Sequence, residues 1–321
     1  MDWTKIRRNR PEGAKPPGVY ANLDDLIRIQ FKARNFSFLP RQPVTSILAG
    51  RYASRLRGRG LNFEELRRYQ PGDDIRTMDW KVTARTRSPH VRVYTEEKDR
   101  SVILIIDQRI NMFFGTRDKL KSVTAAELAA LGAWRALHVG DRAGGVIFND
   151  TEIVDIRPQR SQKTVMSLLG TVMQMNHELR ADSQVTPNPG MLNRALEAAL
   201  QLISHDTLVV MVSDFFGVNE QTERLTARIA EHNDVLALLV HDPIRLQPAA
   251  HNLTVSDGSL QMNVDFADKK VREKIIGDYA VEQEQIKRSL SKLAAPMLMI
   301  SNQGDVVDQV RRLLGVPVRA S

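Results

Sequence analysis

The chain has 321 residues, a formal net charge of +8 and no cysteine. The absence of cysteine excludes disulfide bonds, thiolate metal sites and a cysteine nucleophile. Apolar residues make up 42% of the chain and charged residues 26%, which is typical of a soluble globular protein with enough length for a substantial core.

The first residues of the chain are basic, and they include no apolar segment of the kind that a signal peptide requires. No apolar run approaches the roughly 20 residues that a membrane-spanning helix needs. We therefore expect a cytoplasmic protein without a membrane span. Residues 1–20 are rich in proline, glycine and basic side chains, and this composition predicts a flexible basic leader.

Residues 21–99 are predicted to contain one helix and a charged, loop-rich region that packs on the main domain. Asn22 can cap the helix, whose predicted apolar face consists of Leu23, Leu26, Ile27 and Phe31. Between Leu26 and Phe63 there are eight basic residues and no acidic one. This charge suits an acidic protein, a membrane surface or nucleic acid. Aromatic residues that could stack on bases are sparse, so a protein partner is favoured and nucleic-acid binding is the weaker alternative.

From residue 100 to 316, strand-like and helix-like segments alternate. Continuous apolar runs at residues 101–106 and 207–212 are typical of strands buried on both faces. Three more strands are predicted at residues 144–148, 235–240 and 297–300, with a meander at 253–264. Helices are predicted at residues 117–137, 162–178, 191–203, 220–231, 269–293 and 306–314. Strands separated by helices predict an α/β fold with a doubly wound, mostly parallel sheet.

Polar residues follow the two most apolar strands. Asp107, Arg109 and Asn111 alternate after the first of these strands, and Asp214 comes just after the second. The carboxyl ends of parallel strands meet at one edge of the sheet, where open α/β sheets bind their ligands. If the two strands are neighbours, the two aspartates converge there and could hold a cation such as Mg²⁺.

Several segments resemble known families. Residues 107–111, 140–144 and 212–216 resemble a von Willebrand factor A-type domain. Residues 58–85 and 96–100 are similar to the signature of the bacterial family called domain of unknown function 58, and the similarity extends over about residues 49–242. The signature positions that we expect to be structural or to dock a partner are Arg67, Asp73, Asp74, Arg76, Asp79, Trp80 and Arg85.

This resemblance implies a von Willebrand factor A-like fold that binds other proteins. It also implies a partner, a MoxR-type AAA+ ATPase, and a chaperone-like role in maturing or assembling other proteins. We therefore expect a non-enzymatic adaptor that needs no cofactor.

The resemblance also implies a metal site, from which this chain departs. Related domains bind the metal through an Asp-x-Ser-x-Ser motif, a threonine and a second aspartate. Asp107 and Asp214 match the aspartates, but Arg109 and Asn111 replace the serines. The threonine position falls near Gly190, and Thr186 is the closest hydroxyl. A guanidinium cannot ligate a cation, so we expect a degenerate site in which Arg109 pairs with an aspartate. A Mg²⁺ ion held by the two aspartates is the alternative.

An enzymatic hypothesis rests on the clustered Asp73, Asp74 and Asp79, because paired carboxylates can do acid–base chemistry. A metal-dependent hydrolase or phosphotransfer enzyme would use them, with a metal at Asp107 and Asp214. The sequence offers no nucleophile–base pair and no phosphate-binding P-loop. It favours a structural network in which these aspartates pair with arginines and pack with Trp80, and it leaves a docking role for the nearby arginines open.

Overall fold

The computed structural model describes residues 18–35, 61–71, 73–96, 100–245, 252–256, 261–265, 268–291 and 295–315. The chain divides into two compact units. The larger unit comprises Met1–Val44 and Arg100–Ser321, and the smaller unit comprises Thr45–Asp99. Most of the predicted leader lies outside the described residues. The predicted N-terminal helix belongs to the larger unit, whereas the packing of the signature region on the main domain stays a prediction.

The larger unit is built on a six-stranded sheet with the strand order β10-β7-β6-β3-β4-β5. Only the pairing of β4 with β5 is antiparallel. The predicted α/β fold with a doubly wound, mostly parallel sheet is confirmed. The strands are β3 (Ser101–Asp107), β4 (Arg142–Phe148), β5 (Ile153–Gln159), β6 (Leu208–Ser213), β7 (Asp234–His241) and β10 (Met297–Ser301).

The strand order reverses between β3 and β6. From β3 the chain proceeds to β4 and β5 on one side, and it then returns to place β6, β7 and β10 on the other side. Such a reversal opens a crevice beyond the carboxyl ends of the two central strands. Asp107 ends β3, and Asp214 follows the last residue of β6, so the fold brings both aspartates to this edge.

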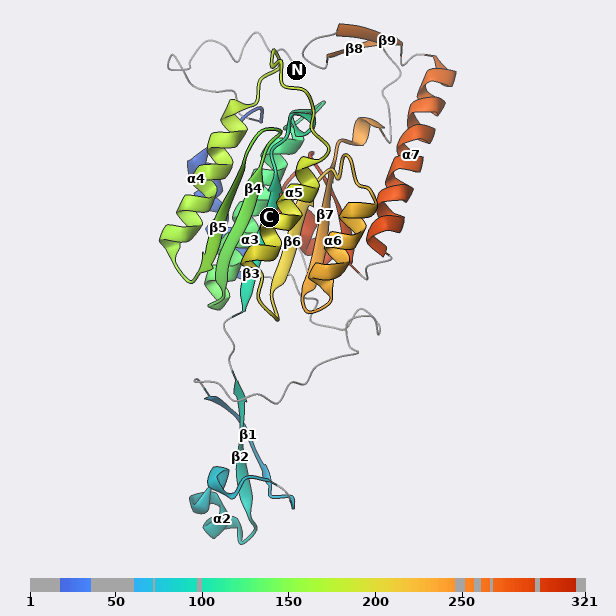
Figure 1. The fold of residues 1–321 in the computed structure, drawn as a ribbon. Helices are drawn as coiled ribbons and strands as arrows, with labels where there is room; N and C mark the ends of the chain where they lie inside the picture. Colours follow the sequence, from blue (N-terminus) through green and yellow to red (C-terminus); the bar gives the residue numbers. More distant parts are fainter. Residues whose placement is uncertain are drawn as a thin grey trace. The chain divides into compact units, whose positions relative to one another are not determined.

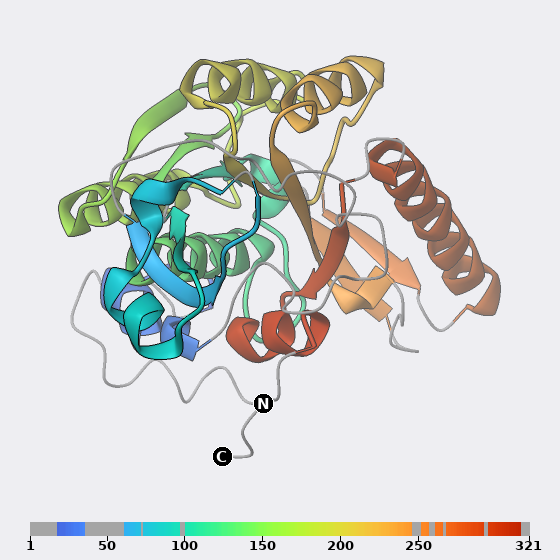
Figure 2. The same cartoon turned by 90° about the horizontal axis from the view of Figure 1, so that it is seen from below.

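Helices cover both faces of the sheet (Figures 1 and 2). One layer contains α1 (Leu23–Lys32), α3 (Lys121–Val139), α4 (Gln162–Glu178) and α8 (Val306–Leu313). The other contains α5 (Met191–Leu202), α6 (Glu220–Ala230) and α7 (Lys269–Ser291). Strand β3 packs against both layers of helices, since Leu104 belongs to the core on one face of the sheet and Ile105 to the core on the other face. This burial on both faces explains the continuous apolar run.

Helix α1 is fixed to the larger unit by Trp134, whose indole Nε1 donates a hydrogen bond to the carbonyl oxygen of Leu26 at 3.1 Å. Asn22 caps this helix as predicted. Phe31 is a correction, because its side chain is 64% exposed and lies near the guanidinium of Arg34. Phe31 follows the buried Leu26 by five residues, which turns it about 140° around the helix from the packed stripe.

The remaining elements of the larger unit are short. Strands β8 (Asn252–Ser256) and β9 (Gln261–Asp265) form an antiparallel pair where the meander was predicted. Three 3₁₀ turns are η2 (Ala33–Asn35), η4 (Ile110–Met112) and η5 (Pro243–Arg245). Strand β5 was not predicted.

The described part of the smaller unit is an antiparallel pair of strands with a helix in the segment that joins them (Figure 1). Its elements are β1 (Leu61–Arg68), η3 (Ile75–Thr77), α2 (Trp80–Thr86) and β2 (His90–Glu96). Only the extended segment within β2 was predicted. The region has regular structure despite its charge, because capping and ion pairs stabilise it as described below.

Candidate functional site

The structure brings all four predicted crevice residues together at the carboxyl edge of β3 and β6. Asp107 is fully buried at the end of β3, and Arg109 lies in the loop that follows it. Asn111, in η4, donates from Nδ2 to both carboxylate oxygens of Asp214 at 2.7 Å. The condition for this convergence, that β3 and β6 are neighbouring strands, is met.

Arg109 forms a fully buried ion pair with Asp107. The Nη2 atom lies 2.6 Å from Asp107 Oδ2, and Nε lies 3.0 Å from Oδ1. Neither side chain is exposed to solvent. Burial alone would lower the pKa of Arg109, but the adjacent Asp107 carboxylate raises it, and the net direction is upward. Arg109 is therefore charged at every accessible pH, and its pairing offsets the cost of burying two ions.

The rest of the Arg109 guanidinium contacts two loops and two aromatic rings. Its Nη1 atom donates to the carbonyl oxygen of Phe216 at 3.1 Å and to that of Asn188 at 3.4 Å. The rings of Phe148 and Phe216 lie 5.4 Å and 6.0 Å from its central carbon, within cation–π range. One side chain thus connects β3 with the loops that precede α5 and follow β6.

Both oxygens of Asp107 are hydrogen-bonded within the protein. Besides the Arg109 side chain, Oδ1 accepts from the Arg109 backbone N–H at 2.9 Å, and Oδ2 accepts from Ser213 Oγ at 2.6 Å. Ser213 also accepts from the N–H of Phe215, a buried residue with a φ of 58°. A bulky residue rarely adopts this left-handed conformation, so the turn after β6 is held in place by the crevice network.

A second cation, Lys121, was not predicted. It begins α3, and its Nζ lies 2.6 Å from Asp214 Oδ2. Burial would raise the pKa of Asp214, but the ammonium of Lys121 and further hydrogen bonds and charges lower it, and the net direction is downward. The sequence did hold a signal, because a helix that follows a strand in a doubly wound sheet begins at the same edge.

Asp150 is a third carboxylate that sequence reasoning missed. It follows β4, accepts from the N–H of Ile110 at 2.6 Å and from that of Asn188 at 2.8 Å, and so joins the η4 turn to the loop before α5. Burial raises its pKa despite these hydrogen bonds. Its position directly after a predicted strand was the available signal.

A divalent cation would need several free oxygen ligands at this edge, and the residues present do not fit one. Each of Asp107 and Asp214 is paired with a basic side chain. Gly190 has no side chain, and Thr186 is exposed. Asn111 Oδ1 is a buried oxygen without a hydrogen-bond partner among the described residues, but it is a single candidate ligand. Among the described residues, no group of three or more histidines, aspartates or glutamates could hold a metal ion.

The ion pair of Lys121 with Asp214 predicts a pH-dependent contribution to stability. A carboxylate whose pKa is lowered on folding stabilises the fold above its unfolded pKa, and that stabilisation is lost as the pH falls through the lowered value. Lys121→Met should reduce the free energy of unfolding at pH 7 by about 2–4 kcal/mol. The difference from wild type should shrink as the pH falls below 3.8, the ordinary pKa of the group. Urea unfolding across a pH series measures both effects, and equal stability of the two proteins at neutral pH would contradict them.

In the smaller unit, the signature aspartates are held by structural contacts. Asp73 accepts two hydrogen bonds from Arg67, at 2.7 and 2.8 Å, and this contact lowers its pKa. Asp79 accepts from the backbone N–H groups at the start of α2 and pairs with Arg92 at 2.8 Å. The pKa of Asp79 is lowered, chiefly by the hydrogen bond from the Val82 N–H. Asp74 caps η3.

The other signature residues are exposed. Arg76 and Arg85 lie at the surface, and Trp80 is 69% exposed. The expected pairing with arginines is found for Asp73 and Asp79, but the expected burial is wrong for the pair of Asp73 with Arg67, which is partly exposed, and the expected packing is wrong for Trp80. Trp80 is the first residue of α2, directly after the Asp79 cap, and the half-buried residues of this helix, Val82 and Thr83, follow it.

Replacing Asp79 by alanine should destabilise the smaller unit by about 1–2 kcal/mol, because α2 loses its N-cap and Arg92 loses a partner. Amide hydrogen exchange of α2 and β2 should accelerate accordingly. Asp182→Ala is a matched control, since it removes an ion pair with Arg180 that is exposed on both sides and should leave the free energy of unfolding nearly unchanged. Unchanged exchange in Asp79→Ala would show that the cap is dispensable.

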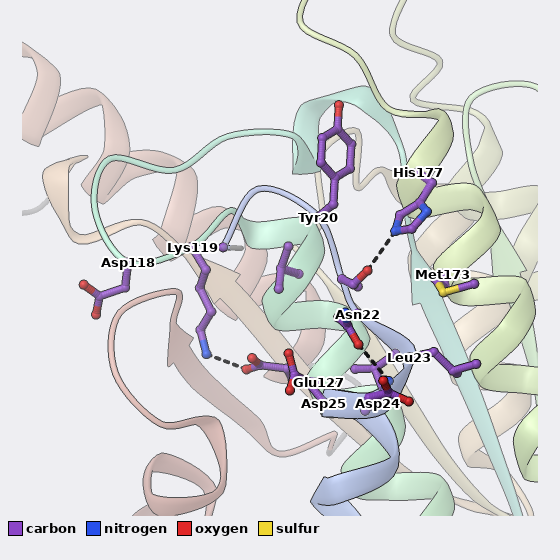
Figure 3. Close-up of a pocket in the computed structure, with 14 residues that line it drawn as sticks. Tyr20, Asn22, Leu23, Asp24, Asp25, Asp118, Lys119, Glu127, Met173 and His177 are labelled. Atoms are coloured by element: carbon purple, nitrogen blue, oxygen red, sulfur yellow. Dashed lines mark hydrogen bonds and ion pairs between the residues drawn. The ribbon is translucent and has the colours of Figure 1, made fainter. Parts of the chain in front are cut away.

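A cavity of about 760 Å³ lies among α1, α3 and α4, and none of the crevice residues lines it (Figure 3). Its wall carries an ion pair between Lys119 and Glu127, and burial raises the pKa of Glu127. His177 contacts the carbonyl oxygen of Ala21 at 2.8 Å. Asp24 and Asp25 lie in the first turn of α1, where acidic residues stabilise a helix.

Comparisons with known proteins find relatives of unknown role. The chain is 27% identical over 310 residues to the uncharacterized protein Rv1480 of Mycobacterium tuberculosis, and equally to Mb1516 of Mycobacterium bovis. Each alignment covers 95% of this chain and 94% of the relative.

The chain is also similar to several solved structures at low identity. The conserved hypothetical protein BatB from Bacteroides thetaiotaomicron is 11% identical, with a TM-score of 0.39, and the match covers 67% of this chain and 98% of that one. An aerotolerance-related membrane protein from Bacteroides fragilis is 11% identical, with a TM-score of 0.38 and coverage of 67% and 96%. A von Willebrand factor type A protein from Catenulispora acidiphila is 10% identical, with a TM-score of 0.32 and coverage of 70% and 43%.

The prediction of a cytoplasmic location is contradicted by these comparisons, because one similar structure is that of a membrane protein. Within the described parts of this chain, no helix has both the length and the apolar character needed to cross a bilayer.

A family model described as "Protein of unknown function DUF58" matches residues 65–285. The match begins in β1 of the smaller unit and ends within α7 of the larger one. It therefore includes the signature segment from Arg67 onward as well as the crevice. The chain belongs to the DUF58 family.

Proposed function

We propose that the chain is a non-enzymatic adaptor that binds a protein partner at the crevice edge without a divalent cation. The observation that carries this proposal is the buried Arg109. Its guanidinium pairs with Asp107, and Lys121 neutralises Asp214. Two fixed cations thus supply the positive charge that a metal supplies in related domains. A metal-free edge of this kind binds by shape, apolar contact and hydrogen bonding.

The rim of the crevice supports a role in protein binding. Phe216 is 38% exposed, and its carbonyl oxygen accepts from Arg109. The neighbouring Gly217 touches the loop before α5, since a Cβ on Gly217 would lie 2.4 Å from the Cβ of Pro189. The exposed Phe216 is therefore presented by two loops that Arg109 and close packing hold together. A rigid aromatic group costs little conformational entropy on binding.

We propose a MoxR-type AAA+ ATPase as the partner and a chaperone-like role in maturing or assembling other proteins. Family membership supports this choice through the association that the resemblance implies. The net charge of +8 supports an acidic partner, since opposite charge speeds association.

The contacts of the clustered aspartates also support a non-enzymatic role. Asp73 and Asp79 are paired with arginines, and Asp74 and Asp79 act as caps. A carboxylate held in this way is a poor general base, because its hydrogen bonds and charge partners stabilise the ionised form. No specific observation favours the hydrolase or phosphotransfer alternative.

The experiment is a binding titration between the purified chain and the MoxR-type ATPase of the same organism, with ATPase stimulation as a second readout. Phe216→Ala should weaken binding by about tenfold or more. Val139→Ala is the matched control, because Val139 is 44% exposed at the last residue of α3, near the opposite edge of the sheet. Failure of the wild-type chain to bind the ATPase in any nucleotide state would overturn the proposal.

A further inference from the structure

Helix α2 presents one fully exposed face. Trp80 and Ala84 are four residues apart, as are Lys81 and Arg85, so these side chains form one continuous surface. All four are exposed, whereas Val82 and Thr83 are half-buried. We call the four exposed residues the α2 face. Asp79 fixes the start of the helix, because its carboxylate caps α2 and pairs with Arg92 of β2.

Within the described part of the chain, the basic groups of the α2 face have no acidic partner. Among the residues that the structure describes, no carboxylate forms an ion pair with Lys81 or Arg85. Arg67 and Arg92, in contrast, are each paired with an aspartate of the same unit. The family signature therefore contains two kinds of residue, one that holds the smaller unit together and one that is left to the solvent.

Trp80 is the part of this face that folding does not explain. Its indole is 69% exposed, and Ile75 in the preceding turn is 63% exposed. Tryptophan has only moderate helix propensity, so α2 gains little from it. Burial of this apolar surface would be favourable, and tryptophan and arginine are the residue types most enriched among binding hot spots.

We propose that the α2 face docks an acidic surface of the ATPase partner, with Trp80 inserted into an apolar pocket of that partner. The proposal rests on the proposed function for the identity of the partner. The charge of the face selects the occupant, since Lys81 and Arg85 lie on the same exposed face as Trp80 and favour carboxylates opposite them.

The test measures the affinity of the full chain for the purified ATPase. Trp80→Ala should weaken binding by about thirtyfold or more. The double variant Lys81→Glu/Arg85→Glu should weaken it further at low salt and reduce its dependence on ionic strength. Matched controls in the same unit are Leu66→Ala and Arg68→Glu, both exposed and both on β1, and they should bind like wild type.

A second readout follows Trp80 itself. The difference in fluorescence between wild type and Trp80→Phe isolates this indole from the two other tryptophans. In the free chain, acrylamide should quench this Trp80 fluorescence as it quenches a water-exposed indole. When the ATPase binds, the quenching should decrease.

The outcomes separate this inference from the proposed function. If the ATPase binds wild type and Trp80→Ala equally, the inference is overturned and the proposed function stands. If the ATPase binds neither, both are overturned. Binding to phosphatidylglycerol vesicles that Trp80→Ala abolishes, with ATPase binding unchanged, would assign the face to a lipid surface and overturn the inference. Self-association lost in Trp80→Ala, again with ATPase binding unchanged, would assign it to a second copy and overturn it equally.

Discussion

Arg109→Met should lower the free energy of unfolding by about 3–5 kcal/mol, the cost of leaving one member of a buried ion pair without its partner. Asp107 has no exposure to solvent, so water cannot replace the guanidinium. The variant should also loosen the loops whose carbonyl oxygens Arg109 contacts, those of Asn188 and Phe216. Urea denaturation measures the loss in the free energy of unfolding. Faster amide hydrogen exchange in the two loops measures their loosening.

The double variant Asp107→Asn/Arg109→Met separates the ion pair from simple packing. It removes both charges with little change in volume, so it should be more stable than Arg109→Met alone, as expected when a buried charge is no longer unpaired. Arg109→Lys keeps the charge but loses the bidentate contact, and it should fall between wild type and Arg109→Met. A loss below about 1 kcal/mol in Arg109→Met would contradict a structural role for the pair.

Removing both crevice cations should convert the site into one that binds metal. The variant Arg109→Ser/Asn111→Ser restores the two hydroxyls of the adhesion-type motif but leaves Lys121 on Asp214. We therefore expect the triple variant with Lys121→Ser to gain affinity for Mg²⁺ and Mn²⁺ and the double variant to gain less. Wild type should give no saturable heat in calorimetry with either ion. At a metal concentration about 100 times its dissociation constant, the triple variant should gain about 2.7 kcal/mol of stability.

The control for the metal experiment is Asp107→Ala in the triple variant, which should abolish the binding. Saturable binding by wild type that is lost in Asp107→Ala would overturn the conclusion that charge has replaced the cation. No gain of affinity in the triple variant would count against it as well.

Much of the fold was predictable because its strands are buried on both faces. The residues of β3 and β6 form continuous apolar runs, and a parallel sheet covered by helices requires this pattern. The rule that ligand sites lie beyond strand ends then located Asp107 and Asp214. Strand β5 was missed because it is an antiparallel edge strand in which half-buried and exposed residues alternate, and it contains Pro158, which weakens a strand prediction.

The rest of the crevice depends on contacts between segments far apart in the sequence. Lys121 meets Asp214 across 93 positions, and Asp150 meets Asn188 across 38. The pattern of apolar residues within one segment carries no information about such contacts. The exposure of Trp80 was equally inaccessible, because a tryptophan beside aspartates and arginines is compatible with a packed network or with a docking surface. The exposure of Trp80 in the structure excludes the packed network.

Binding of the ATPase at the crevice without a divalent cation is tested most directly by one affinity measurement. The dissociation constant for the nucleotide-free ATPase should be the same, within about a factor of two, in EDTA and in excess Mg²⁺, because Arg109 and Lys121 supply the crevice charge in both. Binding that requires Mg²⁺, with a requirement that disappears in Asp107→Asn, would show that the crevice works through a metal and would contradict the proposal.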